Sequence, residues 1–263
     1  SILQDVPGVD NLILVDQRPS KSSQAKHLCS LWNKYDWAII TQQSTRACLY
    51  GYFAARKQTV LSIDRSSKGY WKRLLLSHQV DGIYGHLLDS NAYLLSPILG
   101  FTPHVRPQTP KPTRLPQTLQ KALEDKKYLV FHTQSRYCDK NWSIDGWRNL
   151  LRESLKLGYK VAFTGGKGES ERLYIESVIR DFPKVSVFNL AGELTFNQTT
   201  ELIRNAKVYV GVDTATSHLA AATGTACVCL FGPTDVTVWG PSPLNREGCY
   251  SAKKAVQTLG NVT

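Results

Sequence analysis

The sequence predicts an α/β fold with two Rossmann-like domains, each a doubly wound parallel sheet, that face each other across a ligand cleft. Two observations lead to this prediction. In the second half of the chain, short apolar runs alternate with segments of helical periodicity through short connections, which is typical of a parallel sheet covered by helices. Residues 103–116 hold five of the 12 prolines and few apolar residues, which favours a linker.

We place the linker at residues 107–116, between an N-terminal domain over 1–106 and a C-terminal domain over 117–263. The N-terminal domain is the less regular of the two. Its expected strands are 12–15, 37–40 and 59–63. Its expected helices are 22–32, 45–55 and 91–99.

The C-terminal domain has the clearer pattern. Its expected strands are short apolar runs bounded by polar residues, at 128–132, 160–164, 185–190, 208–212 and 226–231. Its expected helices are 143–157, 169–180, 195–204 and 214–223. Gly158 follows the first of these helices as a C-terminal cap glycine, and Thr195 with Gln198 forms the T-x-x-Q pattern of a capping box.

Composition limits the class of protein. The chain has 263 residues, 42% apolar and 20% charged, which predicts a folded protein with a core. It contains no run of about 18 apolar residues, the length that a membrane-spanning helix needs. The net charge of +11 favours an anionic ligand, a nucleic acid or an acidic surface as partner. The six cysteines form no CxxC pair, so we expect no metal site.

The segment after the strand that ends at Val212 is the strongest candidate site. Asp213 and Thr214 follow the strand at once, and a helix of small residues begins there. The first N–H groups of a helix lack internal partners and lie at the positive end of its dipole, so Thr214 and Ala215 offer a site for phosphate. Asp213 has two roles open to it, a plain helix cap or a ligand contact. His218 lies one turn after Thr214 on the same helix face.

Two further loops follow strands of the same predicted sheet. In the first, Ser135 offers a hydroxyl, while Arg136 and Lys140 can hold a diphosphate through charge-assisted hydrogen bonds. The alternative is an exposed loop with incidental charges. In the second, Glu169 follows a Gly-Gly turn and can accept from a ribose or sugar hydroxyl, or it simply favours the start of a helix.

These segments together resemble the heptosyltransferases of lipopolysaccharide core synthesis, glycosyltransferase family 9, which have the GT-B fold. The matching motifs are K-N-W at 140–142, F-T-G-G-x-x-E at 163–169, V-D-T-x-x-x-H-L-A-A-A at 212–222, and L-F-G-P-T-D with W-G-P within 230–241. The pair D-T-x-x-x-H-L-A-A-A and F-G-P-T-D is specific at this separation.

The resemblance implies transfer of heptose from ADP-heptose to a lipopolysaccharide inner-core acceptor (Kdo-lipid A, through its Kdo or heptose), by direct displacement and with no cofactor or metal. Lys140 and Asp213 are then the catalytic residues, which stabilise the leaving group and the sugar. Gln134 and Ser135 stand where the family has threonines. The implied donor-binding set is Gln134, Ser135, Arg136, Lys140, Glu169, Asp213, Thr214, Ala215 and His218.

The family begins with an apolar strand and a Gly-Asp turn whose aspartate serves as the general base. The resemblance therefore places the opening strand and the base upstream of Ser1. It also implies a cytoplasmic protein, peripheral on the inner membrane of a Gram-negative bacterium, without a nucleic-acid partner.

Positive charge is concentrated in one stretch of the N-terminal domain. Residues 46–73 hold seven basic residues and one acid, Asp64. By the resemblance this domain receives the anionic acceptor, and the expected acceptor-binding residues are Arg65, Lys68, Lys72 and Arg73. Two other functions stay open: a nucleotide-sugar-binding protein without catalysis, and a basic RNA-binding module in which aromatic residues lie between the charges of this stretch.

Overall fold

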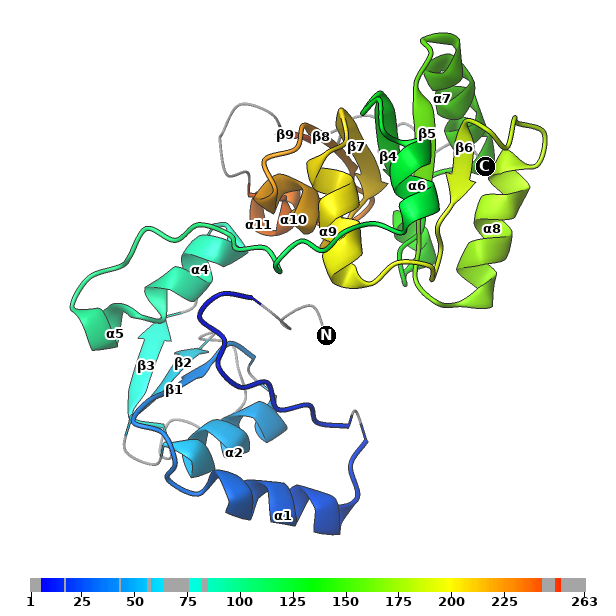
Figure 1. Cartoon of the computed structure of the whole chain (residues 1–263). Helices are drawn as coiled ribbons and strands as arrows, with labels where there is room; N and C mark the ends of the chain where they lie inside the picture. Colours follow the sequence, from blue (N-terminus) through cyan, green and yellow to red (C-terminus); the bar gives the residue numbers. More distant parts are fainter. Residues whose placement is uncertain are drawn as a thin grey trace. The chain divides into compact units, whose positions relative to one another are not determined.

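A computed structural model describes residues 6–16, 18–42, 44–55, 58–63, 76–81, 85–242 and 249–251. The chain forms two compact units (Figure 1). One unit comprises Ile13–Val105, and the other comprises Ser1–Leu12 with Arg106–Thr263. Both contain parallel sheets and helices, so the predicted α/β class is confirmed.

The Ile13–Val105 unit has a three-stranded parallel sheet in the order β1-β2-β3. Its strands are β1 (Ala38–Ile40), β2 (Thr59–Ile63) and β3 (His78–Asp81). Its helices are α1 (Lys21–Leu31), α2 (Thr45–Ala54), α4 (Leu87–Tyr93) and α5 (Ser96–Leu99). Ser20 and Ser44 cap α1 and α2, because each hydroxyl accepts a backbone N–H from the first turn of its helix.

Two predictions for this unit are wrong. Residues 12–15 form no strand: they pair with no strand in the described part of the chain, and the side chain of Leu14 is 76% exposed. The predicted helix at 91–99 is two helices, α4 and α5. Proline lacks an N–H and is tolerated only in the first turn of a helix, so Pro97 lies in the first turn of α5 rather than continuing α4.

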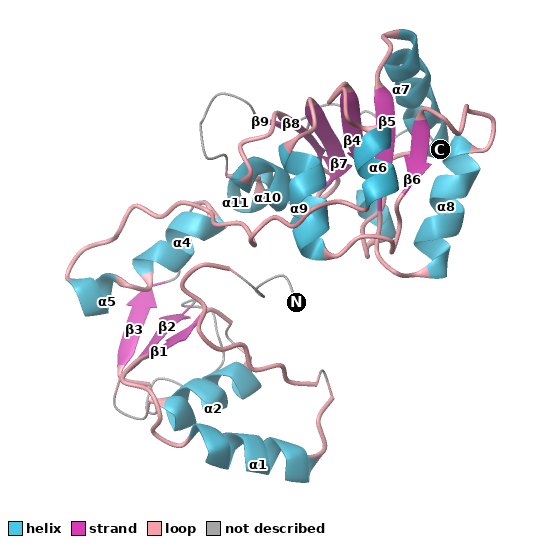
Figure 2. Cartoon of the chain, viewed as in Figure 1, coloured by secondary structure: helices cyan, strands magenta, loops and turns pink. Residues whose placement is uncertain are grey.

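The larger unit has a six-stranded sheet in the order β6-β5-β4-β7-β8-β9, with every neighbouring pair parallel (Figure 2). The strands are β4 (Tyr128–His132), β5 (Lys160–Thr164), β6 (Val187–Asn189), β7 (Val208–Val212), β8 (Cys227–Leu230) and β9 (Cys249–Ser251). The helices are α6 (Gln117–Ala122), α7 (Ile144–Lys156), α8 (Glu169–Ile179), α9 (Phe196–Arg204), α10 (Ala215–Ala222) and α11 (Val236–Trp239).

Helices cover both faces of this sheet, because alternate residues of each strand enter different cores. Tyr128 and Val130 of β4 pack in one cluster with residues of α6, α9 and α10. Leu129 and Phe131 pack in the other with residues of α7 and α8. The sheet is therefore doubly wound.

The proline-rich segment 107–116 is hydrogen-bonded to the start of α9. Asn197 donates through Nδ2 to the carbonyl of Lys111 at 2.9 Å, and its own carbonyl accepts from the N–H of Thr113. Gln198 donates to the carbonyl of Arg114. Within the larger unit, the segment is therefore fixed to α9.

The strand order contains a switch point. From β4 the chain proceeds outward to β5 and β6, then returns to the other side of β4 with β7 and continues to β8 and β9. At such a point the loops after the two central strands diverge and leave a crevice at their carboxyl ends, where doubly wound sheets bind ligands. β4 and β7 are those two strands here.

Candidate active site

The loop after β4 is built to hold Lys140. Residues Cys138–Lys140 form a short 3₁₀ helix, η1. Asn141 closes the loop, since its Oδ1 accepts from the N–H of Ser135 at 2.7 Å. Trp142 then anchors the loop: its ring lies against Gly146, where a Cβ would collide with it, and 5.2 Å from the ring of Trp147. The K-N-W motif thus combines a cation, a loop closure and an apolar anchor.

The loop after β8 supports η1 from the other side. A Cβ on Gly232 would lie 2.6 Å from the carbonyl oxygen of Asp139 and 3.2 Å from the Cα of Lys140. Only glycine allows this approach of two backbones. The glycine of the F-G-P-T-D motif therefore allows the loop after β8 to lie in direct backbone contact with η1.

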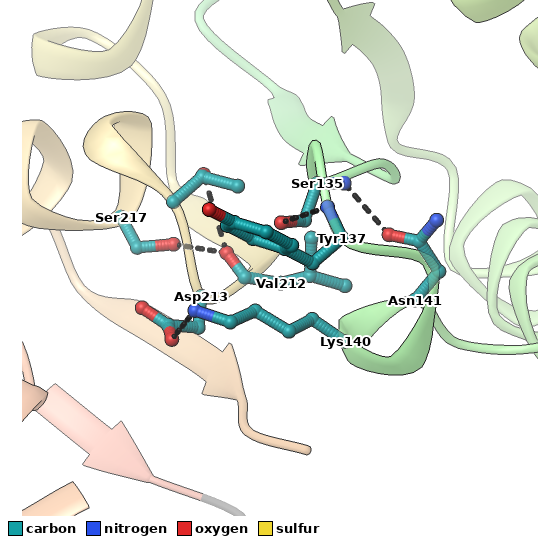
Figure 3. Close-up of polar contacts among 8 residues, drawn as sticks. Ser135, Tyr137, Lys140, Asn141, Val212, Asp213 and Ser217 are labelled. Carbon is teal, nitrogen blue, oxygen red and sulfur yellow. Dashed lines mark hydrogen bonds and ion pairs between the residues drawn. The ribbon is translucent and has the colours of Figure 1, made fainter. Parts of the chain in front are cut away.

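Lys140 and Asp213 meet at the switch point. The Nζ of Lys140 lies 2.7 Å from Oδ2 of Asp213, across a sequence separation of 73 residues (Figure 3). Asp213 directly follows β7 and is 8% exposed, whereas Lys140 is partly exposed. A buried carboxylate next to a lysine at the sheet edge is an ion pair open to solvent on the lysine side.

The start of α10 has no side-chain cap. Thr214 is the N-cap residue, and its hydroxyl donates back to the carbonyl of Val212 at 3.3 Å instead of accepting from the helix. Ser217 also donates to that carbonyl, at 2.7 Å. Because both hydroxyls bond to the carbonyl of Val212, no side-chain cap occupies the N–H groups of the first turn. Such groups at a helix start can bind an anion.

Tyr209 supports the start of α10 from within the sheet, a role that the motif analysis missed. Its hydroxyl lies 2.8 Å from Oγ1 of Thr216 and 3.2 Å from Oγ of Ser217. Burial raises the pKa of Tyr209, so the phenol remains neutral and available as a donor. A Cβ on Gly211 would collide with the Tyr209 side chain. In the sequence, Tyr209 and Gly211 are two residues apart on a strand, and this spacing places them on the same strand face.

His132 ends β4 beside Thr164 of β5. Its Nδ1 lies 3.0 Å from Oγ1 of Thr164, and the register pairs the two residues. Burial lowers the pKa of His132 to about 4, so the ring is neutral near pH 7. This histidine therefore contributes shape and a hydrogen bond to the site, not charge.

A cleft of about 670 Å³ is lined by Lys140, Asp213 and the start of α10. It is lined by every predicted donor residue except one: Gln134, Ser135, Arg136, Lys140, Asp213, Thr214, Ala215 and His218. The exception is Glu169, which is exposed at the first position of α8 and does not line the cleft. Glu171 lines it instead, held by the Gly-Gly turn, since its Oε2 accepts from the N–H of Gly166 at 2.7 Å.

Other predictions concern different parts of the chain. The acceptor residues Arg65, Lys68, Lys72 and Arg73 lie outside the described residues. Within the described residues, no three His, Cys, Asp or Glu side chains gather as metal ligands would. No helix among these residues is long and apolar enough to cross a membrane.

Known proteins match this chain over most of its length. The profile of glycosyltransferase family 9 (heptosyltransferase) matches residues 24–261. Lipopolysaccharide heptosyltransferase 3 of Escherichia coli is 27% identical over 252 residues, which cover 91% of this chain and 74% of that protein. A protein of the same name from Escherichia coli strain K12 is also 27% identical, over 80% of this chain and 62% of its own length.

Solved structures share the fold. Heptosyltransferase WaaC of E. coli with ADP superposes with a TM-score of 0.67 at 20% identity, over 89% of this chain and 72% of that one. A family 9 glycosyltransferase from Veillonella parvula DSM 2008 superposes with a TM-score of 0.74 at 16% identity, over 98% and 75%. The profile match spans most of the chain, and the chain therefore belongs to glycosyltransferase family 9, the heptosyltransferase family.

Proposed function

We propose that this chain transfers heptose from ADP-heptose to the inner core of lipopolysaccharide. The observation that carries the proposal is the Lys140–Asp213 pair, set beside the uncapped start of α10 in a cleft at the switch point. A diphosphate fits this combination of a partly exposed ammonium and a helix start without a side-chain cap. The relatives named above as lipopolysaccharide heptosyltransferases, and the related enzyme solved with ADP, support this choice of donor and acceptor.

The nucleoside is proposed to occupy the β5 and β6 side of the cleft. Gly165 and Gly166 bring the backbone close there, and Leu194 with Phe196 adds apolar surface for a base. Because the N–H of Gly166 binds one oxygen of Glu171, the other oxygen can accept from a ribose hydroxyl. We therefore assign to Glu171 the role that the motif suggested for Glu169.

The proposed reaction is a direct displacement at the anomeric carbon. A general base takes the proton of the acceptor hydroxyl, whose oxygen bonds to that carbon as the bond to the diphosphate oxygen breaks. The negative charge that develops on ADP is stabilised by Lys140 and the N–H groups of α10, which are already in place. Asp213 orients the ammonium of Lys140 and lies next to the transferred sugar. We assign no general base to a residue of this chain.

The acceptor is proposed to be an anionic glycolipid, Kdo-lipid A or a heptosylated form of it. It would be met at the cytoplasmic face of the inner membrane, with the basic stretch 46–73 as the docking surface. The charge of that stretch supports this proposal.

Thermal unfolding with ADP, UDP and GDP tests the donor site. We expect ADP to raise the Tm of the wild type, and Lys140→Ala to lose most of that shift because the ammonium that meets the diphosphate is gone. Lys184→Ala, which removes an exposed lysine from the same unit, is the matched control. The double variant Lys140→Met/Asp213→Asn serves as a second test of the same loss, because it removes both charges and so leaves no buried carboxylate unpaired.

Two outcomes would contradict the proposal. If no adenine nucleotide stabilises the wild type, the assignment of the donor site is wrong. If ADP-heptose binds but no heptose reaches Kdo-lipid A or its heptosylated form, the chain is a nucleotide-sugar-binding protein without this activity.

A further inference from the structure

The loop 133–141 lines one end of the cleft. It leaves β4, and the backbone of its η1 helix lies in close contact with Gly232, which follows β8. Because β7 lies between β4 and β8, the loop passes over the end of β7. Residues after β5 and β6 line the opposite end of the cleft, on the other side of β4. With the diphosphate at the start of α10 and the nucleoside at the β5 and β6 end, the sugar extends toward η1.

Tyr137 lies at the η1 end of the cleft. It directly precedes η1, lines the cleft, and its side chain is 60% exposed. Its ring centroid lies 5.7 Å from Nζ of Lys140, the atom that also contacts Asp213 (Figure 3). The N–H of Tyr137 donates to Oγ of Ser135, which fixes the backbone while the ring stays outside both hydrophobic cores of its unit.

The exposed ring of Tyr137 offers an apolar face to the cleft. A nucleotide sugar has a matching surface, because the C–H bonds of a pyranose form an apolar patch between its hydroxyl groups. Covering that patch removes apolar area from water on both partners. The hydroxyls at the rim of the sugar would remain free for Asp213.

We propose that Tyr137 is a specificity-determining residue that stacks on the sugar of the donor. This inference rests on the proposed function, since it takes the positions of the diphosphate and the nucleoside from it. The ring also contacts the Lys140 cation, so Tyr137 could act on the donor by positioning Lys140. The experiment has to separate this effect from stacking on the sugar. ADP, which has the diphosphate but no sugar, provides that separation.

The experiment is a calorimetric comparison of ADP and ADP-heptose binding to the full chain. Tyr137→Ala should weaken ADP-heptose by about three- to tenfold, the range that aromatic stacking contributes, and leave the Kd of ADP within about twofold. Tyr137→Phe keeps the ring face and should bind both ligands as the wild type does. Tyr93→Ala removes an exposed tyrosine of the other unit and is the control for an unspecific effect.

Turnover provides a second readout. Tyr137→Ala should raise the KM for ADP-heptose, and Tyr137→Phe should restore it. Equal weakening of ADP and ADP-heptose by Tyr137→Ala would overturn the proposal, because the ring would then act only through Lys140. Unchanged binding of both ligands would overturn it as well. If the wild type binds no ADP, the proposed function fails, and this inference fails with it.

Discussion

Asp213 illustrates what a single residue contributes to this site. From the sequence it had two roles open, a helix cap or a ligand contact. The structure makes Thr214 the N-cap residue, and the carboxylate of Asp213 binds Lys140 instead of a helix N–H. The residue therefore adds a buried negative charge at the sheet edge, which fixes the direction of the lysine. Neither role could be chosen from the sequence because Lys140 is 73 residues away.

His132 makes stability depend on pH. Its pKa in the folded chain is about 4, below its ordinary value of about 6.5, because burial disfavours the charged ring. Its contribution to stability is complete above about pH 6.5. It is lost as the pH falls toward 4, since only the unfolded chain takes up the proton there. Between about pH 7.5 and pH 5 we expect a loss of about 2 kcal/mol.

Urea unfolding at the two pH values measures this loss. His132→Gln should reduce the difference in unfolding free energy between them, and His104→Gln, at an exposed position, should retain the wild-type difference. If both variants show the wild-type difference, the buried ring is not its source.

At the level of elements, Gly232 couples the loop after β8 to η1. In Gly232→Ala the new Cβ meets the backbone of Asp139, which cannot turn aside as a flexible side chain can. We expect overpacking to cost about 1–3 kcal/mol of stability. ADP should bind more weakly, because η1 carries Lys140.

Gly168→Ala is the matched control. The new Cβ would meet only Ser170 Oγ, at 3.7 Å, and the residue has a negative φ. Calorimetry with ADP compares the two variants. Equal ADP affinity in both would mean that η1 moves without carrying Lys140 away from the diphosphate.

Most strands of the larger unit were predictable because they are buried on both faces, whereas β9, α6 and α11 were not predicted. The predicted ranges 128–132, 160–164 and 208–212 coincide with β4, β5 and β7, whose residues are almost all apolar and buried. The smaller unit lacks this signal. β3 was missed because its sequence, HQVD, has one apolar residue. Residues 12–15 were mistaken for a strand because they form an apolar run, although their side chains are exposed in the structure.

The sequence predicted those site residues whose position follows from the strand or helix on which they lie. Lys140, Asp213 and Thr214 follow strand ends, and parallel strands bring such ends to one edge of the sheet. The choice between Glu169 and Glu171 depends on which side chain bends back to the Gly-Gly turn, and two acids in one helical turn do not reveal this. The support from Gly232 and Tyr209 depends on packing between distant segments.

For the whole molecule, most of the net positive charge lies in the first part of the chain. Residues 1–116 carry 14 Lys+Arg and 7 Asp+Glu, a net charge of +7, and residues 46–73 supply +6 of it. The proposed donor cleft lies within the larger unit, outside the stretch 46–73. The binding of an anionic surface and the binding of the nucleotide are thus predicted to be separable by mutation.

The triple variant Lys68→Gln/Lys72→Gln/Arg73→Gln tests this separation. Each basic residue near an anionic membrane contributes about 1 kcal/mol, so binding to vesicles rich in anionic lipid should weaken by up to roughly a hundredfold. The effect should shrink with added salt, which screens exposed charges. A control with the same loss of charge is Lys121→Gln/Lys126→Gln/Lys184→Gln, which alters exposed residues of the larger unit.

Cosedimentation with vesicles and calorimetry with ADP distinguish the outcomes. The first triple variant should lose vesicle binding and keep the wild-type Kd for ADP, while the control keeps both. If the two variants lose vesicle binding equally, net charge rather than this stretch attracts the membrane. If the first variant loses binding to RNA and retains binding to vesicles, the stretch serves a nucleic acid, because the same charges then act with the aromatic residues between them.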